Sequence, residues 1–103
     1  MKKALIVIDY TNDFVHDEGA LTCGKPGQEL EGYIVNQIHT FLSSKNLVVF
    51  ATDVHYEGDI GHPETALFPP HNIAGTEGRH LYGDVQRLYK EHKGSQYIKW
   101  MDG

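Results

Sequence analysis

Carboxylate and imidazole side chains gather in the middle of this 103-residue chain. Asp53 and His55 stand two residues apart directly after the apolar run 47–50, and a segment rich in Pro and Gly follows them. In an extended strand alternate side chains point the same way, so this pair can face one site together. Two donors are too few to hold a metal. The later segment supplies three more, which are His62, Glu64 and His71.

This donor set predicts a particular class of metal. Carboxylate with imidazole suits Zn²⁺, Mn²⁺ or Fe²⁺ better than Ca²⁺ or Mg²⁺, and no thiolate lies nearby in the sequence. Spacing does not decide between His62 and Glu64 as a ligand. A competing interpretation is that Asp53 caps the turn and that the histidines are surface residues. Residue types alone leave both interpretations open.

Two strands and the helix between them must position these residues. Segments 4–8 and 47–51 are apolar runs typical of buried parallel strands, and 29–44 carries the apolar spacing of an amphipathic helix. A right-handed crossover between the strands makes them parallel. Asp9 and Asp53 then end at the same sheet edge, where open α/β sheets bind ligands. Asp9 is either a functional group there or a cap of the turn that follows.

The remaining segments predict less regular structure. We expect a long loop at 12–28, an irregular excursion at 54–84, a short helix at 85–92 and a third strand at 96–101. In the first loop, Phe14 is either an anchor beneath the loop or a wall of a ligand pocket. Cys23 has only Lys25 as a nearby cation, so we interpret it as a bystander rather than an activated thiolate.

Composition and net charge indicate which kinds of molecule this chain is suited to bind. The chain is 40% hydrophobic and 22% charged, which fits one soluble domain over 1–103 without repeats. Its net charge is −5 and no Lys/Arg cluster is present, so we expect a small-molecule partner rather than nucleic acid or a membrane. The N-terminal apolar run is too short for a membrane span. A single cysteine excludes an internal disulfide and favours a cytoplasmic location.

Three motifs carry a family resemblance. In order along the chain they are KALIVIDYTNDF at 3–14, TDVH at 52–55 and LFPPHNIAGTEG at 67–78. Together they resemble the nicotinamidase/pyrazinamidase members of the isochorismatase-like cysteine hydrolases. The resemblance runs over essentially the whole chain, and three motifs at compatible spacing make it specific.

The resemblance implies a three-layer α/β/α fold with a parallel sheet, and hydrolysis of nicotinamide or a related aromatic amide to the acid and ammonia. Asp9 matches the base that deprotonates a cysteine nucleophile. Phe14 and Phe68 match positions that wall the substrate ring. The resemblance also implies a metal ion that holds the ring nitrogen of the substrate, with Zn²⁺ as the first choice and Mn²⁺ or Fe²⁺ as alternatives. Its ligands match Asp53, His55, Glu64 and His71.

Two family features have no match. The family's lysine, which stabilises charge, should fall at or within one residue of position 103, where this chain has Gly103. Lys99 lies four residues before that position and in an expected strand. The nucleophilic cysteine belongs to a later strand–helix junction, and Cys23 in the first loop does not match it. We therefore expect this chain to be the N-terminal, incomplete portion of the family fold and to be inactive as an enzyme by itself. A non-catalytic metal- or ligand-binding module is the alternative. An uncovered half-sheet would favour a homo-oligomer.

Overall fold

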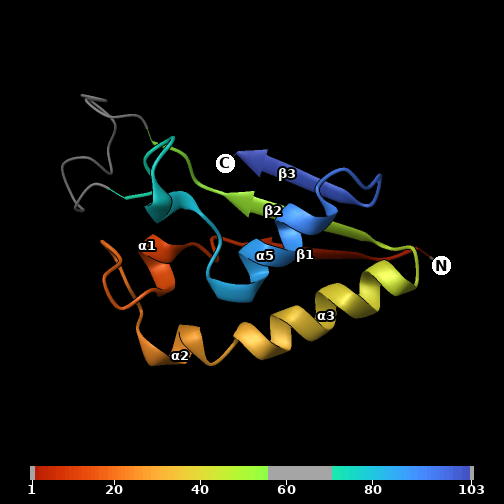
Figure 1. Cartoon of the computed structure of the whole chain (residues 1–103), viewed down its shortest axis with the longest axis horizontal. Helices are drawn as coiled ribbons and strands as arrows, with labels where there is room; N and C mark the ends of the chain where they lie inside the picture. Colours follow the sequence, from red (N-terminus) through yellow and green to blue (C-terminus); the bar gives the residue numbers. More distant parts are fainter. Residues whose placement is uncertain (1, 56–70, 103) are drawn as a thin grey trace.

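Three parallel strands form the sheet of this protein. The structure, a computed structural model, describes residues 2–55 and 71–102 (Figure 1). The strands are β1 (Ala4–Ile8), β2 (Leu47–Thr52) and β3 (Ile98–Asp102), in the order β1-β2-β3 with both pairs parallel. The expected parallel α/β arrangement is confirmed, and all three strands lie within two residues of their expected bounds.

Two longer helices pack on the sheet. They are α3 (Glu31–Ser43) and α5 (Gly83–His92), which lie against each other, and α3 also contacts β1 and β2 (Figure 1). Ile38 of α3 and Leu88 of α5 are buried in the same core as Phe50 of β2. The apolar stripes read from the sequence are therefore the faces that these helices bury.

The expected loop at 12–28 is partly wrong, because it contains two single-turn helices, α1 (Asn12–Val15) and α2 (Lys25–Gln28). Pro26 lies in the first turn of α2, where its missing N–H costs nothing, and Gly24 precedes the helix at φ 70°. Helices of four residues are too short to show an apolar period. A 3₁₀ turn, η1 (Glu77–Arg79), similarly interrupts the excursion that was expected to be irregular.

The sheet has one covered face and one open face. On the covered face, Val7 pairs with Phe50 and Phe50 with Trp100, and α3 and α5 pack over them. On the opposite face Ile6, Ile8 and Met101 are 57%, 68% and 58% exposed. The residues that the structure describes thus form the sheet and one of the two helical layers expected. Within the same ranges, no helix is long and apolar enough to cross a membrane.

Candidate functional site

Asp9 turns from the end of β1 toward the end of β2. Its backbone has φ 53°, a left-handed conformation that Asp tolerates better than most residues. The Asp9 N–H donates to the Ala51 carbonyl at 2.8 Å, and its Oδ1 accepts the Asp53 N–H at 2.9 Å. The expectation that the two aspartates meet at one sheet edge is confirmed. A strained backbone at such an edge is a frequent feature of functional sites.

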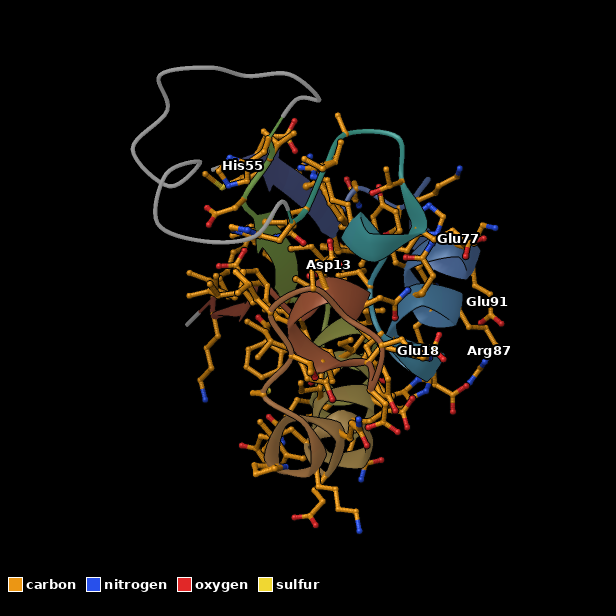
Figure 2. All side chains as sticks on the ribbon, turned by 90° about the vertical axis from the view of Figure 1, so that its left-hand side faces the viewer. Asp13, Glu18, His55, Glu77, Arg87 and Glu91 are labelled. Atoms are coloured by element: carbon orange, nitrogen blue, oxygen red, sulfur yellow. The ribbon has the colours of Figure 1, made fainter. Side chains whose placement is uncertain are left out.

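His55 lies beside the segment that begins at His71. The His55 N–H donates to the Asn72 carbonyl at 3.1 Å, and the Ala74 N–H donates to the His55 carbonyl at 2.8 Å. The two imidazole rings lie 4.8 Å apart between centroids and at 63° to each other. This backbone pairing joins two of the proposed metal ligands across the intervening chain segment. Figure 2, which looks onto the C-terminal ends of the strands, shows His55 at this end of the molecule.

Phe14 provides the apolar side of the same region. Its ring centroid lies 5.4 Å from that of the buried His71 in an edge-to-face arrangement, and Phe14 also packs against the core. Both interpretations of Phe14 are therefore compatible with its position, because it anchors α1 and borders an imidazole. An aromatic face beside imidazole rings suits a flat aromatic ligand.

The full predicted metal set stays a prediction. Glu64, its alternative His62 and the substrate wall Phe68 lie outside the described residues. Within residues 2–55 and 71–102, no group of three His, Cys, Asp or Glu side chains is arranged to hold a metal ion. The strand β2 also ends at Thr52, so the alternation assumed for Asp53 and His55 does not continue as regular sheet. Two adjacent imidazoles and a carboxylate at this edge nevertheless fit the donor chemistry of Zn²⁺, Mn²⁺ or Fe²⁺.

A partly buried polar network that the sequence did not reveal holds the His71 segment in place. Asp13 Oδ2 accepts the Asn72 N–H at 2.7 Å, and Asp13 Oδ1 accepts the Ala20 N–H at 3.3 Å. Asn72 is fully buried at φ 46°, and its Oδ1 accepts the Thr11 hydroxyl at 2.8 Å. Figure 2 shows Asp13 in α1, at the same end of the molecule as His55. The only sequence signal was an Asn beside a candidate ligand, a residue type that tolerates left-handed backbone.

Tyr10 and Cys23 lie in the N-terminal part of the chain, in and beside the segment that carries α1 and α2. The Tyr10 hydroxyl donates to the Gly27 carbonyl at 2.6 Å, and its ring is buried in the core. Burial, followed by the nearby Glu31 carboxylate and the Tyr82 and Cys23 side chains, raises the pKa of Tyr10 to about 12. Cys23 is exposed between α1 and α2.

Comparison with known proteins points to one family. No family model matches the chain. A curated relative from Bacillus subtilis (strain 168), described as an uncharacterized isochorismatase family protein PncA, is 55% identical over 102 residues. Those residues are 99% of this chain and 56% of the relative, so the chain spans about half the length of that relative.

Solved structures give the same picture. The nicotinamidase/pyrazinamidase PncA of Bacillus subtilis superimposes with a TM-score of 0.96 at 52% identity, covering 100% of this chain and 56% of that one. A pyrazinamidase/nicotinamidase of Streptococcus mutans superimposes with a TM-score of 0.95 at 48% identity, covering 99% of this chain and 56% of that one. A pyrazinamidase of Pyrococcus horikoshii in complex with zinc superimposes with a TM-score of 0.76 at 24% identity, covering 99% of this chain and 51% of that one, which shows a shared fold.

Proposed function

We propose, from its likeness to about half the length of an isochorismatase family protein, that the chain is part of a member of that family and carries the general base and metal-binding half of an amidohydrolase. The proposed reaction converts nicotinamide, or a related small aromatic amide, and water to the acid and ammonia. The observation that carries the proposal is the meeting of Asp9 with Asp53 at the sheet edge beside the His55–His71 pair. Relatives at about half identity that are named nicotinamidase/pyrazinamidase support the choice of amide.

Asp9 is proposed to act as the general base. Its carboxylate lies at the edge where substrates bind in open α/β sheets, and the Asp53 N–H fixes one of its oxygens. In this role Asp9 takes the proton from a cysteine thiol as the sulfur attacks the amide carbonyl. That proton passes to the amide nitrogen, the C–N bond breaks, ammonia leaves and a thioester remains. Water then cleaves the thioester, which releases the acid and returns the thiol. Cys23, exposed between α1 and α2, is not assigned this role.

The metal-binding role is assigned to Asp53, His55, Glu64 and His71. A divalent ion bound there would act as a Lewis acid toward the ring nitrogen of the substrate and so orient it. Zn²⁺ is the first choice from the donor set, and a pyrazinamidase that shares the fold is named as a zinc complex. Phe14 and Phe68 are proposed to flank the aromatic ring of the substrate.

A chimera tests this assignment. Residues 1–103 would be joined to the part of the Bacillus subtilis relative that this chain does not match, since the two structures superimpose closely over the shared part. We expect ammonia release from nicotinamide or pyrazinamide. Asp9→Asn in the chimera should lower kcat/KM about 10²-fold or more, because the base is lost. Asp17→Asn, on an exposed aspartate, is the matched control.

Two results would count against the proposal. A folded chimera that releases no ammonia from either amide would contradict the assigned reaction, and full activity of Asp9→Asn would contradict the assigned base. The 103-residue chain by itself is expected to release no ammonia, because no cysteine in it matches the family nucleophile. Metal binding without hydrolysis by the folded chimera would favour the alternative, a non-catalytic metal-binding module.

A further inference from the structure

Arg79, the last residue of η1, connects the ends of two strands. Its Nε donates to the Asp53 carbonyl at 3.1 Å, and its Nη2 lies 3.5 Å from the Thr52 carbonyl. The same Nη2 forms an ion pair with the Asp102 carboxylate at the end of β3. The Arg79 side chain is only 16% exposed. A guanidinium thus occupies the position where two parallel strands end and leave carbonyl groups without ladder partners.

A second residue of β3, Trp100, also contacts the guanidinium of Arg79. Arg79 lies over the Trp100 ring, with its Cζ 5.5 Å from the centroid, and the Trp100 Nε1–H donates to Asp102 Oδ1 at 2.8 Å. The hydrogen bond from Arg79, and then that from Trp100, holds the pKa of Asp102 below its usual range. Asp102 therefore stays ionised, and three groups of different chemistry fix the plane of one arginine.

Arg79 completes the restraint of the backbone on both sides of one residue, Asp53. The Asp53 N–H is bonded to the Asp9 carboxylate, and the Asp53 carbonyl is bonded to Arg79. Asp53 follows β2 directly, so these two bonds set the path that the chain takes from the sheet toward His55. The N–H of this residue is fixed by the proposed base and its carbonyl by the arginine.

We propose that Arg79 is a positioning residue, which fixes the Asp53 backbone and thereby the placement of the Asp53 and His55 side chains as metal ligands. This inference rests on the metal site of the proposed function. Outer residues of this kind orient metal ligands, and their loss commonly weakens metal binding by about 10-fold to 100-fold. The planar fork of arginine can reach two carbonyls and a carboxylate together, whereas the single ammonium of lysine does not reproduce that geometry.

Arg87 offers a matched control. Its side chain is 54% exposed and pairs with Asp84 at 3.3 Å and Glu91 at 3.0 Å, both within α5. Figure 2 shows Arg87 and Glu91 together on α5, away from His55. Exposed pairs along a helix contribute little to stability. Replacing Arg87 therefore changes the charge of the chain by the same amount without touching the strand ends.

The test compares Arg79→Lys and Arg79→Ala with Arg87→Lys and Arg87→Ala in the 103-residue chain. Zinc affinity is measured by calorimetry, and amide hydrogen exchange at Asp53 and His55 by NMR. We expect Arg79→Ala to weaken zinc binding roughly 10-fold or more, with partial rescue in Arg79→Lys and faster exchange at both amides. The Arg87 variants should stay within about twofold of the wild type.

The outcomes separate this inference from the proposed function. Wild-type zinc affinity and exchange rates in both Arg79 variants would overturn the role of Arg79. If Arg79→Ala does not fold, Arg79→Lys decides alone. If the wild type binds no zinc, the proposed metal site fails, and the inference that Arg79 positions metal ligands fails with it. Exchange rates that change equally in the Arg79 and Arg87 variants would also overturn it, because the effect would then follow from charge alone.

Discussion

The two faces of the sheet differ in what covers them, although both carry large apolar side chains. Val7 and Phe50 lie under α3 and α5, whereas Ile6 and Ile8, alternating with Val7 on the same strand, are largely exposed. A continuous apolar run is typical of a strand buried on both faces. The described chain fulfils that pattern on one face only. Apolar sequence therefore indicates which surface is suited to burial, and the partner elements decide whether burial occurs.

Stability and chemistry are accordingly located in different places. The covered face holds the buried core, and the proposed chemistry lies at the edge formed by Asp9, Asp53 and His55, on neither face. Substitutions on the covered face should change the free energy of unfolding. Substitutions on the open face should change association instead, and those at the edge should change ligand binding.

The largest effect is expected on the covered face. Phe50 is fully buried and packs against Tyr89 at 5.3 Å between ring centroids. Phe50→Ala should lower the free energy of unfolding by about 3–5 kcal/mol, because it removes an aromatic side chain and leaves a cavity. Chemical denaturation measures this. A loss below about 1 kcal/mol would show that the covered face is not the core of the protein.

An intermediate effect is expected from Tyr10 at alkaline pH. The pKa of Tyr10 is raised to about 12 in the folded protein from its ordinary value of 10.0, so the folded state holds the proton more tightly. The stability from this residue is complete below pH 10 and is lost as pH rises through 12, up to about 2–3 kcal/mol. The free energy of unfolding, measured from about pH 9 to about pH 12 around the ordinary pKa of a phenol, should show this loss.

Tyr10→Phe provides the comparison for that pH dependence. The variant lacks the hydroxyl that bonds to the Gly27 carbonyl, so it should be less stable by about 1 kcal/mol at neutral pH. The difference between wild type and variant should shrink as pH rises above 10 and should reverse near pH 12, because only the wild type loses the titration-linked stability. A constant difference across the alkaline range would show that Tyr10 does not titrate with a raised pKa.

The smallest effect on stability is expected on the open face. Ile8→Lys should change the free energy of unfolding by only about 0.5 kcal/mol, because Ile8 is 68% exposed. It should also lower the apparent mass in light scattering if the open face drives the predicted homo-oligomer. Asn36→Lys on the exposed side of α3 controls for added charge. A wild type that is a soluble monomer would refute that prediction.

The sequence predicted those features that depend on local pattern. Strand β1, the two amphipathic helices and the meeting of Asp9 with Asp53 all follow from apolar spacing and from the handedness of crossovers. The Asp13–Asn72 contact joins residues 59 positions apart and leaves no periodic trace. Arg79 was missed for a related reason, since two of its partners are backbone carbonyls, which no sequence displays.

The metal content of the purified 103-residue chain tests whether this sheet edge holds a metal site. We expect about one bound divalent ion per chain, as is usual for a protein site of this donor type, and its loss in Asp53→Ala and His71→Ala. Asp17→Ala and His39→Ala remove exposed residues of the same types and should retain the metal. Equal metal in the wild type and all four variants, or none in the wild type, would contradict a metal site at this edge of the sheet.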